Sequence, residues 1–389
     1  MTPKSLLYTL FSSVTLGLAA SIPQTTYDVI VVGGGPAGLS TLSGLSRVRR
    51  SAVMFDSGEY RNAPTRNMHD VIGNDGTPPA EFRGLAREQI SRYDTASIID
   101  KKILTITPYQ DNNETTHFEA KDADGKIYSA RKVVLGTGLV DLIPDTPGLR
   151  EAWGQGAWWC PWCDGYEHRD QPIGILGSLV DAVGSMLEIH TLNSDIVALA
   201  NGTQTPEVEA QLTEEKPDWR AQLAAWNVRI ENKTIDSFRR LQDGEEHRDN
   251  EGRQFDVFEV TFTDGTTLQR NAFITNYETA QLSTLPAELG LQMQEEKIDT
   301  SSFSGMRTSV AGVWAVGDCN SDGSTNVPHA MYSGKQAAVY AHMEMAREES
   351  AVAIGKRGMD MPSRRALMKE AERTIGTNLE DIWKRVQRS

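Results

Sequence analysis

The sequence predicts an α/β protein made of two units of β-sheet covered by helices, and two observations lead to this fold class. Tyr27–Val32 has the apolar, β-branched composition of a buried strand, and a glycine-rich turn, a helix and a second strand at Ala52–Phe55 follow it. A similar series begins at residue 172. The chain has 389 residues, of which 39% are hydrophobic, so it is long enough to bury two cores.

Periodicity and turn residues place the other elements. In the first unit we expect helices at residues 39–47 and 79–93, a hairpin of residues 116–120 and 127–130, and a strand at residues 132–135. In the second unit we expect alternating strands and helices at residues 172–176, 180–191, 195–200, 219–227, 257–261 and 272–275. A strand at residues 310–318 and a long amphipathic helix at residues 327–346 follow. Pro144 and Pro147 mark a crossing between the units.

The glycine-rich turn of the first unit has the spacing of a dinucleotide site. Gly33 makes the tight turn, Gly35 lets the backbone approach a pyrophosphate, and Gly38 lets the helix pack on the strand. Asp56 ends the second strand, where a carboxylate holds a ribose hydroxyl. The order of strand, turn, helix, strand and acid therefore predicts a bound dinucleotide.

The corresponding turn of the second unit lacks this pattern. Gly177 stands at the tight turn, but Leu179 stands where the backbone should approach the pyrophosphate, and its side chain is expected to fill the phosphate position. Ala182 is the small residue at the helix, and the next strand ends at Asn201 without an acid or an arginine for a ribose. This predicts a second unit that keeps the fold without binding a nicotinamide nucleotide.

Cys160 and Cys163 are separated by two residues, and Asp164 follows directly. Two thiols at this spacing can close into a reducible disulfide, and a neighbouring carboxylate can move protons, which together predict a thiol redox centre. A zinc site would need a second Cys/His pair, and Cys319 is the only other cysteine and is expected to be a buried apolar residue. The alternative for the pair is a disulfide with a structural role only, and the alternative for Asp164 is a helix-capping residue.

Two further groups surround these motifs. A polar loop at residues 59–81, which contains Arg61, Asn62, His69 and Asp70, is expected to lie along the cofactor. The alternative is that this loop is a plain surface connection. Half of the eight tryptophans lie close to the cysteine pair, and they are Trp153, Trp158, Trp159 and Trp162. They are expected to form an apolar wall around the cofactor and a small substrate cleft, with packing between domains as the alternative.

The chain begins with the features of a cleavable secretory leader. Lys4 precedes an apolar run at residues 6–18, and small residues follow. The run is shorter than the about 20 residues that span a membrane, so we expect a secreted protein with no membrane part in its mature form. Sequons at Asn113, Asn201 and Asn232 fit this route. The formal net charge of -14 argues against a nucleic-acid partner.

Taken together, these motifs resemble the low-molecular-weight thioredoxin reductase family of flavoproteins over essentially the whole mature chain. The matching segments occur in the family's order and spacing, and they are residues 33–38, Gly136-Thr137-Gly138, residues 160–165 and Gly317-Asp318. The resemblance implies two Rossmann-like domains of three layers (ββα). It implies a discontinuous FAD-binding domain at 24–143 and 294–350 and an inserted disulfide-bearing domain of nicotinamide type at 144–293. It also implies a homodimer. The residues themselves predict a leader at 1–20 and a helical extension at 351–389.

The resemblance further implies which residues contact FAD. They are Gly33, Gly35, Pro36, Ala37, Gly38, Asp56, Arg61, Asn62, Gly136, Thr137, Gly138, Gly317, Asp318, His329 and Ala330. Asp318 falls where the family binds the ribityl chain, and His329-Ala330 falls where a side chain and an amide face the flavin pyrimidine edge at a helix N-terminus. His329 is also a second candidate base, with helix capping as the alternative.

Among relatives, the sequence is similar to secreted fungal sulfhydryl (glutathione) oxidases and to dithiol oxidases of natural products. This predicts a thiol oxidase in which Cys160 exchanges with a small thiol, Cys163 faces the flavin, Asp164 moves the proton and O2 is reduced to H2O2. An NADPH-dependent disulfide reductase and a non-enzymatic scaffold are the rivals. Because an oxidase does not need the family's domain rotation, we expect one resting arrangement, with Cys163 against the isoalloxazine and Cys160 reachable from solvent.

Overall fold

The computed structural model describes residues 26–110, 116–300, 304–323 and 325–355, together with residues 366 and 369. The expected leader, the sequon at Asn113 and most of the expected C-terminal extension lie outside the described residues. Across the described ranges, none of the helices combines the length and the apolar character that a bilayer span requires.

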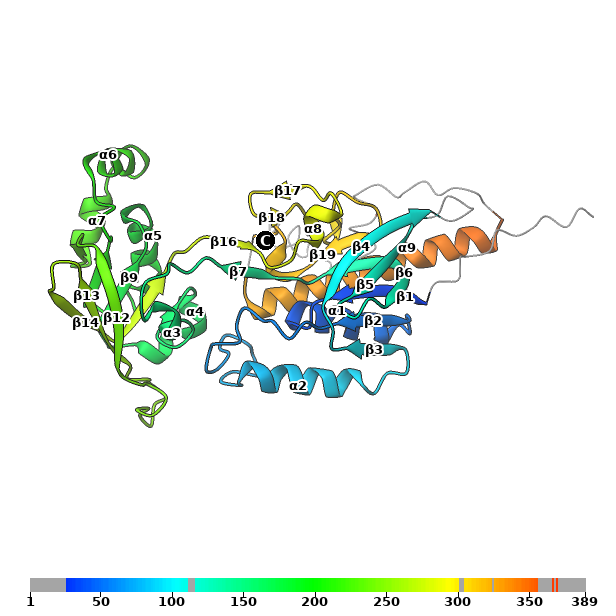
Figure 1. The fold of residues 1–389 in the computed structure, drawn as a ribbon, viewed down its shortest axis with the longest axis horizontal. Helices are drawn as coiled ribbons and strands as arrows, with labels where there is room; N and C mark the ends of the chain where they lie inside the picture. Colours follow the sequence, from blue (N-terminus) through cyan, green and yellow to red (C-terminus); the bar gives the residue numbers. More distant parts are fainter. Residues whose placement is uncertain are drawn as a thin grey trace, which may run out of the picture.

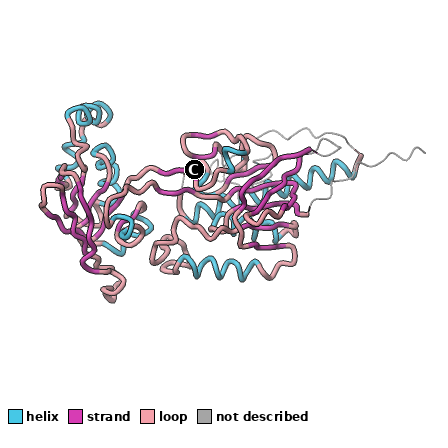
Figure 2. Tube along the Cα trace, viewed as in Figure 1, coloured by secondary structure: helices cyan, strands magenta, loops and turns pink. Residues whose placement is uncertain are grey.

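The chain forms two lobes that two adjacent strands connect (Figures 1 and 2). The first lobe contains the elements from β1 to β6 and from α8 to α9, and the second lobe contains those from α3 to β15. The connecting strands are β7 (Leu139–Asp141) and β16 (Thr279–Gln281), which pair antiparallel. This arrangement confirms the predicted fold class, in which one sheet unit is inserted into another.

The sheet of the first lobe has the strand order β3-β2-β1-β6-β5-β4, and β19 pairs with the second half of β6, beyond the half that pairs with β5. Its strands are β1 (Tyr27–Val32), β2 (Ala52–Phe55), β3 (Ala96–Ile99), β4 (Ile103–Gln110), β5 (Thr116–Asp122), β6 (Ile127–Leu135) and β19 (Val313–Ala315). The pairs around β1 and the β6–β19 pair are parallel, whereas β4, β5 and the first half of β6 form an antiparallel meander.

Both faces of this sheet are buried, as its apolar strands require. Val29 and Val31 face a core that includes α1 (Pro36–Arg47) and α9 (Val327–Ala353), and Ile30 and Val32 face the core on the side of the meander. The other elements of this lobe are α2 (Pro79–Ile90), α8 (Leu285–Glu288), β17 (Met293–Gln294), β18 (Lys297–Ile298) and the 3₁₀ turn η3 (Gly317–Cys319). The result is a three-layer unit.

The second lobe repeats this architecture. Its parallel sheet has the order β11-β10-β9-β15-β8, and an antiparallel sheet of β12, β13 and β14 covers one face. The strands are β8 (Ala157–Trp158), β9 (Ile173–Leu176), β10 (Ile196–Leu199), β11 (Arg229–Glu231), β12 (Ile235–Gln242), β13 (Val257–Phe262), β14 (Thr267–Arg270) and β15 (Ala272–Thr275). The helices α5 (Leu179–Ile189), α6 (Pro206–Glu215) and α7 (Trp219–Ala225) cover the other face.

The cysteine pair lies in a short helical segment between β8 and β9. This segment contains α4 (Pro161–Asp164) and the 3₁₀ turn η1 (Tyr166–His168), and α3 (Leu149–Ala152) precedes β8. It lies on the side of the second lobe that faces the first (Figure 1). The fold therefore brings the cysteines toward the carboxyl ends of the parallel strands of the first lobe, the edge at which ligands bind in open α/β sheets.

Three predicted strands differ from the structure. The strands expected at residues 127–130 and 132–135 are one strand, β6, whose first half alternates in burial while its second half is continuously buried. The strand expected at residues 310–318 is limited to β19, because Gly312 and Gly317 both adopt positive φ (81° and 70°) and turn the chain on either side of it. Left-handed backbone is incompatible with a continuing strand.

Candidate disulfide and cofactor site

A large cleft opens where the first lobe meets α4 of the second lobe. It encloses about 1360 Å³, including space open to solvent. Most of its wall comes from the first lobe, and the second lobe contributes Cys163 and Asp164. Of the predicted cofactor residues, those that line it are Gly33, Gly35, Pro36, Ala37, Arg61, Asn62, Gly136, Thr137, Gly138, Gly317, Asp318 and Ala330. Two distant motifs of the sequence, the glycine turn and the cysteine pair, thus share one cleft.

The glycine turn of residues 33–38 forms a backbone cradle in this cleft. Gly33 has φ of 117°, and a Cβ atom on it would lie 2.1 Å from the carbonyl oxygen of Gly136. A Cβ atom on Gly38 would lie 1.9 Å from the carbonyl oxygen of Gly33, so the helix can approach the strand only with glycine here. A Cβ atom on Gly35, in contrast, would have no other atom within 4 Å, and Gly35 borders the open cleft. The three glycines therefore have the three distinct surroundings that the motif requires.

Arg61 connects the cleft wall to the strand that leads into the second lobe. Its guanidinium binds Asp141 of β7 in a bidentate manner, with N···O distances of 2.9 and 2.6 Å, and donates to Asp318 Oδ2 at 3.0 Å. The Arg61 side chain is 13% exposed and lies over the ring of Trp159. Bidentate arginine–carboxylate pairs fix orientation strongly, so Arg61 positions Asp318 at the cleft.

Cys160 and Cys163 form a disulfide, and the two sulfurs have different surroundings. Cys160 is the N-cap residue of α4 and does not line the cleft, whereas Cys163 lies in the last turn of α4 and lines it. Both residues are partly exposed. The disulfide is thus presented with one sulfur toward the cleft and the other outside it, and one electron pair can pass through it between solvent and cleft.

Asp164 lines the cleft beside Cys163 and has an unusual acidity. Burial raises the pKa of the Asp164 carboxyl to about 8, with the Glu167 carboxylate adding to the rise and the Arg66 guanidinium opposing it. Because Asp164 stands at the end of α4 opposite the N-cap residue, helix capping does not explain it. A carboxyl with this pKa can both accept and donate a proton near neutral pH.

The predicted residues Asp56, Gly38 and His329 do not line the cleft. Asp56 is buried, and its carboxylate accepts hydrogen bonds from Gly58 N, the Tyr60 hydroxyl and Arg87. These bonds fix the orientation of the carboxylate, and the contact of Asp56 with a ribose stays a prediction. Gly38 serves only the packing of α1.

His329 is turned away from the cleft as well. Its ring Nε2 lies 2.6 Å from Asp322 Oδ1, and its backbone N–H donates to Asn326, the N-cap residue of α9. Asn326 and Ala330, on either side of it in sequence, do line the cleft. The cap of α9 is therefore Asn326, and the His329 ring makes a hydrogen bond with Asp322 within the first lobe.

The tryptophans near the cysteines pack within and between structural elements and do not form the expected wall, since none of them lines the cleft. Trp158 is fully buried in the core of the second lobe, and Trp153 is 7% exposed and stacks on Trp159. Trp162 is 67% exposed next to Cys163. Cys319 is fully buried as expected, with its thiol directed at the carbonyl oxygens of Leu135 and Val316.

A family model described as pyridine nucleotide-disulphide oxidoreductase matches residues 27–334 of the sequence. The chain belongs to this family. It is therefore an oxidoreductase that acts on thiol or disulfide groups, in agreement with the position of its disulfide in the cleft.

Two of the similar proteins are fungal and are named as thioredoxin reductases. A probable thioredoxin reductase of Arthroderma benhamiae is 49% identical over 372 residues, which cover 93% of this chain and 92% of that protein. Thioredoxin reductase tcpT of Claviceps purpurea is 31% identical over 324 residues, covering 82% of this chain and 94% of that protein. The crystal structure of HlmI superimposes with a TM-score of 0.72 at 28% identity, covering 84% of this chain and 95% of that one.

In this pyridine nucleotide-disulphide oxidoreductase, the N-terminus of α5 occupies the position of a second nucleotide site. The structure corrects the expected role of Leu179, whose side chain is fully buried in the core and does not fill the phosphate position. Polar groups of the chain close the helix end instead. Ser178 donates to Asp181 Oδ2 from its backbone N–H (3.2 Å) and its hydroxyl (2.6 Å), and Leu179 N–H donates to Thr203 Oγ1 at 2.9 Å.

At the N-terminus of α5, the backbone N–H groups that would bind a phosphate already donate to Asp181 and Thr203. Backbone N–H donors at a helix N-terminus attract anions, and the carboxylate of Asp181 already satisfies part of that end. Asn201, which follows β10, is turned toward β12, because its side-chain oxygen accepts from Ile235 N–H at 2.7 Å. A pyrophosphate would have to displace an internal carboxylate that repels it.

Sequence analysis missed several residues of the cleft wall. Lys101 and Lys102 line the cleft just after the carboxyl end of β3. Residues at this end of a parallel strand often contact ligands, but β3 was not predicted from the sequence. Ser57, Tyr60 and Met68 also line the cleft. They belong to the polar loop of residues 59–81 or border it, and that loop follows the cleft as expected through Arg61, Asn62, His69 and Asp70.

Proposed function

We propose that this family member is an FAD-dependent thiol oxidase that forms disulfides from small thiols such as glutathione. The overall reaction converts two thiols and O2 into one disulfide and H2O2. The observation that carries the proposal is the closed N-terminus of α5, where Asp181 and Thr203 accept the hydrogen bonds that a pyrophosphate would need. An enzyme that receives its electrons from a pyridine nucleotide needs this position for binding. An oxidase that receives them from thiols does not.

The cleft residues fit FAD. The open surroundings of Gly35 allow a pyrophosphate to approach the backbone, and the N-terminus of α1 supplies N–H donors to it. Asp318, oriented by Arg61, offers an acceptor for a hydroxyl of the ribityl chain. When bound here, FAD supplies a group that accepts an electron pair from a dithiol and transfers it to O2.

The two cysteines of the second lobe would divide the thiol chemistry between the solvent side and the cleft. A substrate thiolate attacks Cys160 Sγ, the Cys160–Cys163 bond breaks, and Cys163 leaves as a thiolate inside the cleft. A second substrate thiolate then attacks the substrate sulfur of this mixed disulfide, so that the bond to Cys160 breaks, the oxidised product is released and Cys160 leaves as a thiolate. This order follows from the positions of the two sulfurs, since only Cys163 lines the cleft.

Asp164 is the residue that would move protons in these steps. Its carboxyl borders Cys163, and its pKa of about 8 matches the acidity of a free thiol, about 8.5. Proton transfer is most efficient between groups of similar pKa near the working pH. We assign no such role to His329, because its ring pairs with Asp322 outside the cleft.

The rival function is an NADPH-dependent disulfide reductase, which the names of the two fungal relatives favour. The two functions differ in the electron donor. Under anaerobic conditions, NADPH should leave the flavin absorbance of the purified protein unchanged, whereas glutathione or dithiothreitol should bleach it. Bleaching by NADPH would overturn the oxidase proposal and support the reductase.

The decisive activity measurement is oxygen uptake with small thiols. Wild-type protein with glutathione or dithiothreitol should consume one O2 for every two thiols and release H2O2, and Cys160→Ser should consume none. A panel of glutathione, a small dithiol and a reduced protein identifies the substrate class. Protein that carries flavin and remains inert toward all three under air would refute the proposal.

We further propose that the mature protein is secreted and forms a homodimer. Of the two described sequons, Asn201 is exposed, whereas the Asn232 amide is held by Gln204 through both its oxygen and its nitrogen. A glycan on the Asn232 nitrogen would break one of these bonds. Expression in a secreting fungus should therefore place the protein in the medium with Asn201 as the better acceptor, and retention of the protein inside the cells would contradict secretion.

A further inference from the structure

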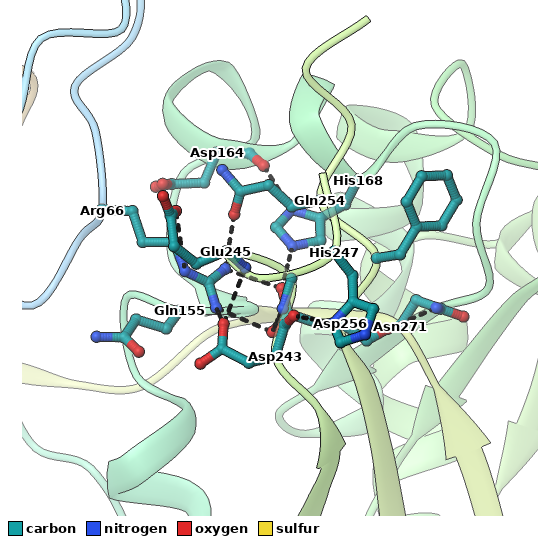
Figure 3. Close-up of polar contacts among 12 residues, drawn as sticks. Arg66, Gln155, Asp164, His168, Asp243, Glu245, His247, Gln254, Asp256 and Asn271 are labelled. Atoms are coloured by element: carbon teal, nitrogen blue, oxygen red, sulfur yellow. Dashed lines mark hydrogen bonds and ion pairs between the residues drawn. The ribbon is translucent and has the colours of Figure 1, made fainter. Parts of the chain in front are cut away.

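One arginine of the first lobe inserts its side chain into the second lobe. Arg66 belongs to the polar loop, and its guanidinium donates to Asp256 Oδ2 at 2.8 Å and Oδ1 at 3.0 Å, to Asp243 at 2.6 Å and to Gln254 at 2.6 Å (Figure 3). The three acceptors come from the region between β12 and β13. The side chains of Arg66 and Asp256 are 9% and 0% exposed. A buried bidentate contact of this kind is strong and geometrically specific.

The second lobe holds Asp256 ready for this contact with its own residues. The Asp256 carboxylate also accepts from Arg240, from Gly244 N–H at 3.0 Å and pairs with His168 Nε2 at 3.2 Å. Although burial alone would raise the pKa of the Asp256 carboxyl, the hydrogen bonds from His168 and Arg66 hold it below its ordinary value. Because Arg240 and His168 remain when Arg66 is removed, the second lobe can fold without Arg66.

The same carboxylate supports the helix that carries the cysteines. His168 bridges Asp256 and the backbone carbonyl of Asp164, with its Nδ1 at 3.0 Å from that oxygen. Arg66, Asp256, His168 and Asp164 thus form a continuous chain of contacts from the first lobe to the end of α4 (Figure 3). In addition, the positive charge of Arg66 lowers the pKa of the Asp164 carboxyl and so opposes the rise that burial causes.

Other contacts between the loop and the second lobe are weaker. Asn67 accepts from Arg248 at 2.7 Å, and His69 lies 3.6 Å from Glu167. Arg248 is one third exposed, at 32%, and contacts between exposed groups contribute little. Apart from the loop, β7 and β16 connect the lobes as a two-stranded ribbon. A ribbon of this size does not fix the orientation of two domains by itself.

We propose that Arg66 is a positioning residue, and that its contact with Asp256 is a latch that holds α4 in the cleft wall. With the latch closed, Cys163 and Asp164 border the cleft and Cys160 lies outside it. With the latch open, the second lobe turns on the β7/β16 ribbon and Cys163 leaves the cleft. The catalytic consequence rests on the proposed thiol oxidase function, whereas the latch itself does not.

The latch can be tested by the accessibility of the two thiols in flavin-loaded protein. The protein is reduced anaerobically with dithiothreitol, exposed briefly to iodoacetamide well below its unfolding midpoint, and analysed by mass spectrometry for the ratio of alkylation at Cys163 and Cys160. In the wild type, Cys163 should be the protected thiol. Arg66→Gln should raise the Cys163/Cys160 ratio roughly tenfold, because a buried charged contact at an interface is lost. Arg66→Lys, which keeps the charge but not the bidentate geometry, should lie between the two.

Arg248→Gln is the matched control, because it removes an arginine contact between the same loop and the same lobe at the surface. It should leave the alkylation ratio unchanged. Small-angle X-ray scattering on the same proteins should show a larger radius of gyration only for Arg66→Gln. If Arg66→Gln does not fold, Asp243→Asn removes the negative charge of one acceptor of the latch and should shift the ratio in the same direction by a smaller factor.

Protection of Cys163 in Arg66→Gln equal to that in the wild type, with an unchanged radius of gyration, would overturn the latch. These measurements need neither turnover nor oxygen. An opened Arg66→Gln variant together with a wild type that consumes no oxygen would therefore support the latch and refute the thiol oxidase. If the latch and the thiol oxidase function are both correct, Arg66→Gln should lower kcat. The KM for the thiol should stay near the wild-type value, because Cys160 remains accessible to the substrate.

Discussion

Cys163 borders the cleft that contains the glycine cradle, while Cys160, its disulfide partner, does not. The four-residue helix α4 produces this difference, because it places Cys160 at its N-cap and Cys163 in its last turn. A disulfide at the boundary of a cleft has one sulfur open to incoming thiols and one sulfur facing the group that removes the electrons. The order of events in the proposed reaction follows from this geometry.

The first prediction separates the roles of the two sulfurs. Cys163→Ser should accumulate a mixed disulfide between Cys160 and the substrate after treatment with glutathione disulfide, because the resolving sulfur is absent. Cys160→Ser should form no adduct at comparable rate, since Cys163 faces the cleft. Mass spectrometry of the intact protein measures both. Both variants should lose oxygen uptake with thiols.

Cys319→Ser is the control for this experiment. Cys319 is fully buried, and burial raises the pKa of its thiol, so it should react with neither substrate nor alkylating reagent. The serine hydroxyl can donate to the same carbonyl oxygens, those of Leu135 and Val316. A glutathione adduct on Cys319, or equal adducts on Cys160 and Cys163, would contradict the assignment.

The second prediction concerns the proton transfer by Asp164. Asp164→Asn should lower kcat for thiol oxidation by about 10²-fold or more, which is the usual contribution of a positioned acid or base. In the wild type, kcat should rise with pH through a limb near 8, where the Asp164 carboxyl becomes ionised and able to accept a proton. That limb should disappear in the variant, while the ionisation of the substrate thiol still affects kcat/KM. An unchanged limb in Asp164→Asn would exclude the carboxyl as its source.

The third prediction concerns stability and follows from the same raised pKa. The folded protein binds a proton at Asp164 up to about pH 8, whereas the unfolded chain releases it near 3.8. The favourable contribution of the protonated group is therefore complete below the unfolded pKa and is lost as the pH rises through the folded value. Asp164→Asn is neutral at every pH. Relative to this variant, the wild type should lose stability as the pH rises from about 4 to about 8.

Thermal unfolding of the flavin-loaded proteins measures this difference. Because burial raises the pKa of the Asp164 carboxyl to about 8, we expect at least about 1 kcal/mol, which corresponds to roughly 2–4 °C in Tm. Glu167→Gln provides a comparison, since Glu167 raises the pKa of the Asp164 carboxyl and its removal should flatten the wild-type dependence. A constant difference in Tm between wild type and Asp164→Asn across this range would contradict the raised pKa.

The parts of the site that the sequence predicted correctly are those in which neighbouring residues determine the geometry. The surroundings of Gly33, Gly35 and Gly38 depend on one turn between a strand and a helix, so the spacing was sufficient. The position of Asp56 at the end of β2 was also predicted, but the partner of its carboxylate was not. Arg87, 31 residues later on α2, donates a hydrogen bond to this carboxylate.

Contacts between distant segments could not be predicted in this way. Arg66 and Asp256 are separated by 190 positions, and neither belongs to a motif. The strand β4 was missed for a local reason, because a bulge near Ile103 breaks its alternation and only Ile103 and Ile106 are buried. Leu179 was correctly identified as a departure from the nucleotide pattern, but its side chain turns into the core, and Asp181 closes the site.

The last prediction tests this closure directly. Asp181→Ala should destabilise the protein by about 1 kcal/mol, because it removes the carboxylate that accepts from Ser178 at the N-terminus of α5. Asp218→Ala is the matched control, since Asp218 is the N-cap residue of α7 but makes no side-chain capping bond there. Urea denaturation of both variants measures the difference.

Calorimetric titration of the same proteins with NADPH examines the functional consequence. The wild type should show no binding heat, because a pyrophosphate would meet the Asp181 carboxylate and N–H groups that already have acceptors. Asp181→Ala removes the repulsion but leaves Thr203 bound to Leu179 N–H and supplies no acid or arginine for the ribose, so binding should remain absent or very weak. Tight binding of NADPH to the wild type would show that the closed helix end opens for a nucleotide, and the electron donor would then have to be reassigned.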